Sequence, residues 1–301
     1  MAEMLSGILT ALITPFRALG DSRDPLSLSP IDWPALEGLI EDQISSGVSG
    51  LVPCGTTGEA STLSHEEHLQ VVRFVVERTA GRVPVIAGAG ANSTHEAVML
   101  TRGAQEAGAD GVLSVTPYYN RPQRSGLIAH YTAIASVGLP VALYNIPSRT
   151  GLALTIDDYR QLAKIPGIVA TKEASGDFGL ADLLLADGDL TVLSGDDAKG
   201  LPLLAMGAKG IVSVASHLVG RELVDLVDFI GEGDLTRARE IHRRLLPLFQ
   251  ALFIESNPAP LKAALAARGT IEPVLRPPLA AASESAFQAV EAAWTRATTV
   301  A

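Results

Sequence analysis

The segment GIVATKEASG, residues 167–176, gives the first indication of the fold. A short apolar, β-branched run bounded by glycines predicts a strand buried on both faces. The run leads directly into Lys172, and lysine is almost never fully buried without a partner or a function. Because burial disfavours the ammonium form, we expect a lowered pKa for Lys172 and an amine able to form a Schiff base with a carbonyl. In the alternative interpretation, Lys172 extends to solvent or pairs with Glu173.

Similar runs recur along the chain, at residues 8–13, 50–52, 83–87, 111–115, 141–144, 190–193 and 210–214. Segments with helical periodicity separate them, at residues 31–46, 64–79, 94–107, 125–137, 155–163, 177–186 and 198–206. This alternation is typical of parallel strands joined by crossover helices. Together with the run before Lys172 there are eight such strands, which favours a (β/α)8 TIM barrel. An open dinucleotide-binding sheet would carry G-x-G-x-x-G after its first strand, and the TPFRALGDS segment there lacks it.

The last part of the chain is helical, with expected helices at residues 221–230, 234–253, 258–267 and 280–298. Asn257 followed by Pro258 indicates a helix start, as an N-cap before a proline at the first helical position. We therefore predict a catalytic barrel over residues 1–225 and a C-terminal helical extension over residues 226–301. Residues 18–30 form a polar loop to which we assign no role.

Composition excludes several classes of protein. The 301 residues are 47% hydrophobic and 19% charged, with a net charge of −10 and no basic run, so nucleic-acid binding is not expected. The single cysteine, Cys54, cannot form an internal disulfide, which fits a reducing compartment. The apolar run near the N-terminus lacks a cationic start and is too short to span a bilayer. We expect a soluble cytoplasmic protein that makes no contact with a membrane.

Polar residues gather where the predicted strands end, which is the catalytic end of such a barrel. The GTTGE turn, residues 55–59, offers backbone N–H groups and two hydroxyls to a carboxylate, or its glycines serve only the turn geometry. Tyr119 and Tyr144 are candidates for proton transfer, against the alternative of buried hydroxyls that only satisfy a hydrogen bond. Arg149 would hold a carboxylate or remain solvated. Cys54 fits a small buried residue better than a nucleophile.

Metal and phosphate chemistry find little support in the sequence. His65 and His68 stand one helical turn apart, but no further ligands at metal-binding spacing accompany them. The loop after the seventh strand carries Asp196 and Asp197, which would repel a phosphate. We therefore expect an unphosphorylated carboxylate or carbonyl substrate, no metal and no cofactor.

The strand ends, taken in order, resemble the dihydrodipicolinate synthase and N-acetylneuraminate lyase family of Schiff-base-forming barrels. The resemblance runs from about Gly7 to the last helices, through GTTGEAS at 55–61, VTPYYNRP at 115–122, LYNIPSRTG at 143–151, TKEASGD at 171–177, LSGDD at 193–197 and ESNPAPLKAAL at 255–265. The second threonine, the paired tyrosines and SRTG follow the synthase branch. That branch condenses pyruvate with L-aspartate 4-semialdehyde to 4-hydroxy-tetrahydrodipicolinate in lysine and diaminopimelate biosynthesis.

The resemblance implies a role for each strand-end residue. Lys172 would form the imine with pyruvate, and Tyr144 would transfer protons in a relay with Thr56 and with Tyr119 from a neighbouring subunit. The remaining substrate-binding positions would be Thr57 for the pyruvate carboxylate, Arg149 for the semialdehyde carboxylate, and Gly195 and Val212 lining the pocket with backbone carbonyls. The resemblance also implies a homotetramer built as a dimer of dimers.

A second site is implied for the inhibitor L-lysine. The matching positions are Ala60, Ser61, His65, His68, Asn92, Glu96 and Tyr118. Glu96 would pair with the α-amino group of lysine, and Asn92 and Tyr118 would hold its carboxylate. Alternatively, both histidines are solvent-facing residues of a helix start. Two other functions remain open: a pyruvate-imine aldolase or dehydratase acting on a sugar acid or hydroxy-oxo acid, and a barrel that binds small molecules without turnover.

Overall fold

The computed structural model describes residues 3–19 and 28–299. Within them, eight parallel strands form one sheet in the order β2-β1-β8-β7-β6-β5-β4-β3. The strands are β1 (Gly7–Ala11), β2 (Gly50–Val52), β3 (Ile86–Gly88), β4 (Gly111–Val115), β5 (Val141–Asn145), β6 (Ile168–Glu173), β7 (Thr191–Ser194) and β8 (Gly210–Ser213). A single parallel bridge between Leu51 and Val85 joins the two ends of the sheet. The predicted (β/α)8 barrel is confirmed.

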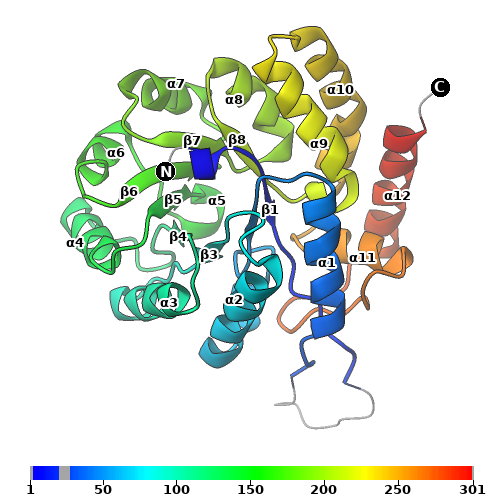
Figure 1. Cartoon of the computed structure of the whole chain (residues 1–301), viewed down its shortest axis with the longest axis horizontal. Helices are drawn as coiled ribbons and strands as arrows, with labels where there is room; N and C mark the ends of the chain where they lie inside the picture. Colours follow the sequence, from blue (N-terminus) through cyan, green and yellow to red (C-terminus); the bar gives the residue numbers. More distant parts are fainter. Residues whose placement is uncertain (1–2, 20–27, 300–301) are drawn as a thin grey trace.

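Helices surround this barrel (Figure 1). They are α1 (Trp33–Ser45), α2 (His65–Thr79), α3 (Thr94–Glu106), α4 (Arg124–Ala135), α5 (Pro147–Thr150), α6 (Ile156–Leu162), α7 (Phe178–Asp187), α8 (Gly200–Met206) and α9 (Ser216–Gly231), with short 3-10 turns η1 (Glu3–Leu5), η2 (Ala60–Thr62) and η3 (Asp197–Lys199). The short helix α5 was not predicted, and α9 begins five residues earlier than expected. No helix of the described chain has the length and hydropathy needed to cross a membrane.

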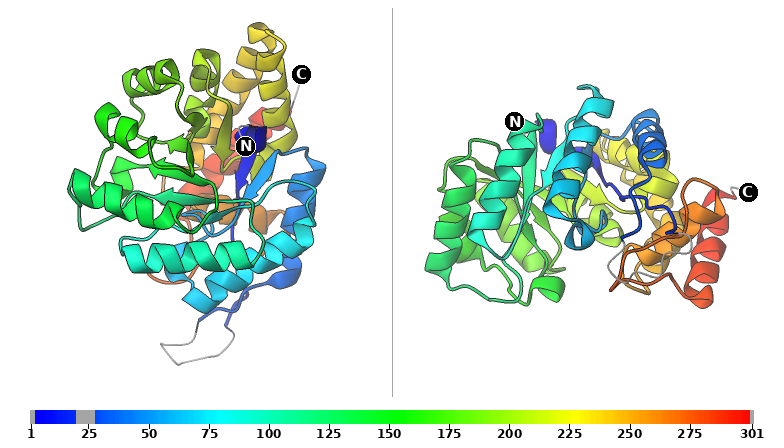
Figure 2. Two further views of the ribbon diagram at one scale, coloured as in Figure 1. Left: turned by 60° about the vertical axis from the view of Figure 1, so that its left-hand side comes forward. Right: turned by 90° about the horizontal axis from the view of Figure 1, so that it is seen from below.

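The C-terminal helices are α10 (Leu235–Ala251), α11 (Ala259–Ala267) and α12 (Glu284–Thr298), and they lie together on one side of the barrel (Figure 2). Helix α9 runs through residue 225, where the sequence analysis divides the chain. We propose that α9 completes the barrel and that the extension begins beyond it. The predicted cap of α11 is wrong, because the helix starts after Pro258 without a side-chain cap and the Asn257 amide turns to Thr57 instead.

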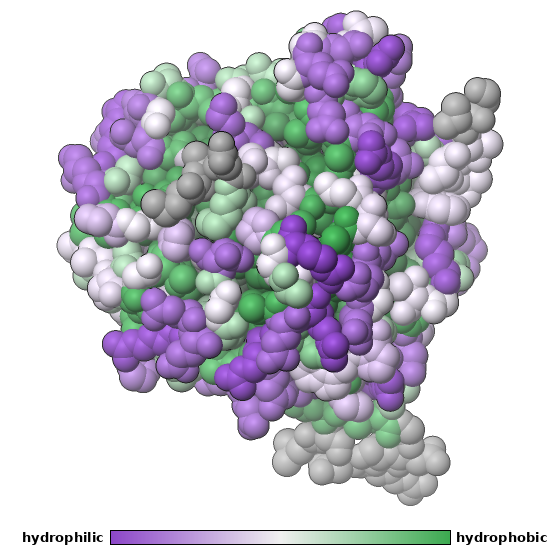
Figure 3. Space-filling view, viewed as in Figure 1, coloured by the Kyte–Doolittle hydropathy of each residue, from purple (hydrophilic) through white to green (hydrophobic). Residues whose placement is uncertain are grey.

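The two ends of the barrel differ in what covers them. The turn η1 directly precedes β1, so it lies across the end at which the strands begin (Figure 1). Leu5 of this turn is buried. On the face seen in Figure 3, hydrophilic residues dominate the rim and apolar residues lie between the helices. The loop at residues 18–30, left without a role above, falls partly outside the described residues. The other end of the barrel, where the strands finish, is the one that carries the polar side chains.

Candidate active site

Lys172 is the buried lysine expected at the end of β6. It is 6% exposed, and its Nζ lies 4.4 Å from the centroid of the Tyr144 ring on the adjacent strand β5. Burial lowers the pKa of Lys172 to about 8; the charge of Asp197 opposes this shift and that of Arg149 adds to it. The predicted direction is confirmed. With such a pKa roughly a tenth of the amine is unprotonated at pH 7, so it can attack a carbonyl carbon.

Glu173 points away from Lys172, as successive side chains of a strand do. Its carboxylate accepts hydrogen bonds from Asn145 Nδ2 at 3.0 Å, the Tyr159 hydroxyl at 2.8 Å and the Ser175 N–H at 2.6 Å. These three donors hold the acid on the helix side of the barrel. The alternative that Glu173 pairs with Lys172 is therefore wrong, and the lysine owes its shifted pKa mainly to burial.

Tyr144 connects Lys172 to a cavity of about 430 Å³ at the end of the barrel. Thr56, Tyr144 and Arg149 all line this cavity. Burial raises the pKa of Tyr144 to about 12, against the opposing effects of the Arg149 charge and a hydrogen bond with Thr56. Tyr144 is thus a neutral phenol at pH 7, with a proton to donate next to the amine. Arg149 lies in α5 with its side chain exposed, at the edge of the same cavity.

The GTTGE turn presents backbone donors with no partner. The N–H groups of Thr56 and Thr57 donate to no acceptor within the described part of the chain. Thr57 itself is buried, and the Thr14 hydroxyl fixes the turn by donating to the Gly58 carbonyl at 2.7 Å. An added Cβ at Gly58 would lie 2.9 Å from the Leu12 carbonyl oxygen, so this glycine is required by packing. Gly58 therefore serves the geometry of the turn, and the binding of a carboxylate by the threonine N–H groups stays a prediction.

Gly195 and Asp197 shape the surroundings of the lysine stem. A Cβ at Gly195 would lie 3.1 Å from both Cγ and Cε of Lys172, so only glycine leaves room for the lysine. Asp197 is buried and its Oδ2 accepts from the N–H groups of Val214 and Ala215, each at 3.0 Å. Burial raises the pKa of Asp197. The sequence analysis gave Asp197 no role beyond repelling phosphate, although it is a charge that acts on Lys172. Val212 in β8 is buried, and its predicted role in lining the pocket stays a prediction.

Tyr119 is not brought to Lys172 within one chain. Its side chain is 90% exposed, in the loop after β4, and its backbone has a φ of +74°. The hydroxyl makes no hydrogen bond to the residues that the structure describes. The neighbouring Tyr118 lines the cavity instead.

The residues expected at the lysine site mostly surround the same cavity as Thr56 and Tyr144. Its lining includes Ala60, Ser61, His65, His68, Glu96 and Tyr118. His65 Nε2 lies 2.9 Å from Glu96 Oε1, and the buried His68 has its Nε2 2.7 Å from the Gly88 carbonyl oxygen. The solvent-facing alternative is therefore wrong for His68, whose pKa burial lowers. Asn92 is outside the lining, and its carbonyl accepts from Asn120.

Sequence reasoning missed a buried ion network behind the GTTGE turn. Lys262 of α11 pairs with Glu59, and both side chains are fully buried. The backbone N–H of Arg276 donates to the Glu59 carboxylate. The guanidinium of Arg276 donates to Glu67 from both terminal nitrogens, at 2.8 and 2.6 Å. Lys262 and Arg276 each lie 4.3 Å from the Phe16 ring centroid. A lone Glu, Lys or Arg in a sequence carries no signal for such pairing over about 200 residues.

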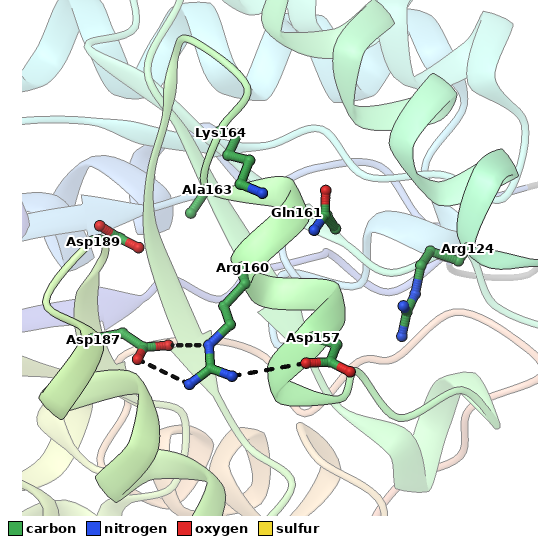
Figure 4. A pocket seen from close by; sticks show the side chains of 8 residues that line it. All are labelled: Arg124, Asp157, Arg160, Gln161, Ala163, Lys164, Asp187 and Asp189. Atoms are coloured by element: carbon green, nitrogen blue, oxygen red, sulfur yellow. Dashed lines mark hydrogen bonds and ion pairs between the residues drawn. The ribbon is translucent and has the colours of Figure 1, made fainter.

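A second cavity, of about 600 Å³, lies on the outer helices and holds none of the predicted residues (Figure 4). Arg160 of α6 reaches across it to Asp187, at 2.8 and 3.1 Å. The guanidinium also lies 3.8 Å from Asp157. Because none of the predicted residues lines this cavity, the candidate site remains at the end of the barrel.

Comparison with known proteins agrees with this geometry. The model of the dihydrodipicolinate synthetase family matches residues 4–297. The chain belongs to the dihydrodipicolinate synthetase family. A family member from Syntrophus aciditrophicus, named 4-hydroxy-tetrahydrodipicolinate synthase, is 50% identical over 92% of each chain.

Solved structures of the dihydrodipicolinate synthetase family have the same fold. The dihydrodipicolinate synthase of Acinetobacter baumannii, described as chloride-inhibited and in complex with pyruvate, has a TM-score of 0.92 and 40% identity and covers 98% of this chain and 99% of its own. The enzyme of Cyanidioschyzon merolae with lysine bound has a TM-score of 0.92 and 40% identity, covering 99% of this chain and 100% of its own. The predicted family resemblance is confirmed.

Proposed function

We propose that this protein is a 4-hydroxy-tetrahydrodipicolinate synthase, which condenses pyruvate with L-aspartate 4-semialdehyde in lysine and diaminopimelate biosynthesis. The observation that carries the proposal is the buried Lys172 amine, with its pKa lowered to about 8, packed against Tyr144. Relatives that align over nearly the full length bear this enzyme name. We further propose that the enzyme acts in the cytoplasm, without a metal or a cofactor.

The chemistry follows from the amine. Lys172 attacks the ketone carbon of pyruvate, water leaves and an imine remains. The protonated imine withdraws electrons, so the methyl group loses a proton and becomes an enamine carbon. This carbon attacks the aldehyde, and the amine of the new product then displaces Lys172 and closes the ring. Tyr144 is proposed to move the protons, together with Thr56.

The substrates carry carboxylates, which need donors. We propose that the unpartnered N–H groups of Thr56 and Thr57 bind the pyruvate carboxylate, since two adjacent N–H groups form an anion-binding concavity. Arg149, at the edge of the cavity, is proposed to hold the semialdehyde carboxylate in a charge-assisted pair. Gly195 and Val212 would line the pocket with backbone carbonyls.

We propose that L-lysine regulates the enzyme by binding in the part of the cavity that Glu96 and Tyr118 line. Glu96 supplies the negative charge for an ammonium group there, and Tyr118 supplies a hydroxyl for a carboxylate. A family member has been solved with lysine bound. Because Tyr119 makes no side-chain hydrogen bond within the described chain, we also propose that it completes the site of a second subunit, in a dimer that pairs into a tetramer.

One experiment tests this function. The protein is incubated with pyruvate, reduced with borohydride and weighed by mass spectrometry, and we expect a single adduct that Lys172→Ala abolishes. Turnover is then followed with L-aspartate 4-semialdehyde and a coupled reductase, with and without millimolar L-lysine, which we expect to inhibit. Absence of an adduct contradicts the imine chemistry. An adduct without turnover of the semialdehyde would favour a pyruvate-imine aldolase or dehydratase for another acid.

A further inference from the structure

Asn257 of the C-terminal extension reaches the turn that carries Thr56 and Thr57. It lies two residues before α11 and is 5% exposed. Its Nδ2 donates a hydrogen bond to Thr57 Oγ1 at 2.9 Å, across 200 positions of sequence. This contact is buried, so water does not compete for either group.

The direction of this hydrogen bond constrains the Thr57 hydroxyl. A threonine hydroxyl has one proton to donate and two lone pairs to accept. Because an N–H of Asn257 occupies one lone pair, the hydroxyl proton must point elsewhere. Thr57 Oγ1 donates to no acceptor in the described residues, and neither do the N–H groups of Thr56 and Thr57. Three donors on two adjacent residues are thus left for a ligand, and the ligand that accepts from all of them is a carboxylate.

The extension holds this turn at a second point as well. Two residues beyond Thr57, Glu59 pairs with the buried Lys262 of α11. Asn257 and the helix that follows it therefore contact Thr57 and Glu59, respectively, in the same turn. A hydroxyl held in this way binds a carboxylate without first losing rotational freedom.

We propose that Asn257 is a positioning residue that turns the Thr57 hydroxyl toward the carboxylate of the bound 2-oxo acid. The proposal rests on the proposed function, because it takes a 2-oxo acid as the substrate of Lys172. Asn257 does not touch the substrate itself. It acts through Thr57, so its effect must disappear when the Thr57 hydroxyl is absent.

The test is a double-mutant cycle read out by pyruvate binding. The variants are Asn257→Ala, Thr57→Val and the two combined, and the measurement is the pyruvate concentration that gives half-maximal borohydride-trapped adduct. We expect each single change to raise this concentration about tenfold, the equivalent of one hydrogen bond of about 1.4 kcal/mol. The double variant should bind pyruvate no more weakly than Thr57→Val alone. KM for pyruvate should rise in parallel, while KM for the semialdehyde stays unchanged.

Two further variants separate orientation from stability. Asn257→Asp keeps the shape but can only accept, so it would draw the Thr57 proton away from the substrate, and we expect weaker pyruvate binding than in Asn257→Ala. Ser283→Ala removes the N-cap of α12 in the same extension and should lower stability without changing pyruvate affinity.

Effects of Asn257→Ala and Thr57→Val that multiply in the double variant would overturn the proposal. So would an Asn257→Ala affinity equal to that of the parent or of Ser283→Ala. Failure of the parent protein to form any adduct would instead overturn the proposed function, so the two failures are distinguishable.

Discussion

At the residue scale, Lys172 is kept where its charged form is unfavourable. The cation is buried, and the face of the Tyr144 ring is its one close charge-stabilising contact among residues 3–19 and 28–299. No carboxylate forms an ion pair with it among the described residues, although Asp197 acts on it at longer range. The protein therefore buries an ammonium group whose charged form is unfavourable at the candidate site, and this favours the unprotonated, reactive amine.

The buried charge of Lys172 lowers the free energy of unfolding, and this loss can be measured. Its pKa is about 8 in the folded chain against 10.5 in the unfolded chain, so below pH 8 the folded state carries a buried charge. This cost falls as the pH rises from 8 to 10.5, since the unfolded chain then binds more protons than the folded one. We expect Lys172→Met to raise the free energy of unfolding at pH 7 by on the order of 2 kcal/mol. The gain should shrink toward zero near pH 10.5, as measured by urea unfolding.

The control for this prediction is Lys209→Met, at an exposed position. It should change stability little at either pH. A Lys172→Met variant that is less stable than the parent at pH 7, or whose difference from the parent does not vary with pH, would contradict the buried charge.

Residues of the site differ in how far the sequence reveals them. Lys172 is predictable because a charged residue ends a buried strand, and the fold places all strand ends together. Asn257 is not, because the Asn-Pro pair also satisfies the rule for a helix start. Only the three-dimensional structure shows that its amide is already bonded to Thr57.

At the element scale, periodicity locates the elements well and their ends less well. Strands β2 and β4 have the predicted bounds. Strand β1 stops at Ala11, although the apolar run continues, since Leu12 and Ile13 are buried core residues beyond the ladder. The four-residue helix α5 is too short to show a period, yet it positions Arg149. Motifs that depend on contacts between distant elements, such as Glu59 with Lys262, leave no periodic signal.

The buried Glu59–Lys262 ion pair connects α11 to the GTTGE turn, and its contribution to stability can be predicted. Glu59→Gln leaves the Lys262 cation buried without its counter-charge, and we expect it to lower the free energy of unfolding by about 3 kcal/mol or more. Combining Glu59→Gln with Lys262→Met removes the unpaired buried charge, so the double variant should recover a large part of the lost free energy of unfolding. Urea unfolding at pH 7 measures both.

An exposed pair provides the comparison. Glu41 forms an ion pair at the surface, with both terminal nitrogens of Arg82. We expect Glu41→Gln to lower the free energy of unfolding far less than Glu59→Gln does, because solvent screens the charge. Equal losses for Glu59→Gln and Glu41→Gln, or no recovery in the double variant, would mean that the buried pair does not join the two elements.

At the scale of the whole molecule, one chain supplies all but one of the proposed catalytic groups. Lys172, Tyr144 and Thr56 come together within the barrel, whereas Tyr119 extends outward with 90% of its surface exposed. A large aromatic residue in a loop with a positive φ is held in an unfavourable conformation. The family resemblance predicted a role for Tyr119 in the site of a neighbouring subunit, and this role stays a prediction.

Complementation between two defective chains tests this arrangement. Tyr119→Phe should lower turnover by about 10²-fold or more through loss of proton transfer, and Lys172→Ala should abolish it. The two variants are co-expressed with different tags, and the dimer that carries both tags is purified. In a two-fold dimer with exchanged tyrosines, one site of this hybrid has both an intact Lys172 and an intact Tyr119, so its activity should be about half that of the parent dimer. A hybrid no more active than Tyr119→Phe alone would show that Tyr119 acts within its own chain or not at all.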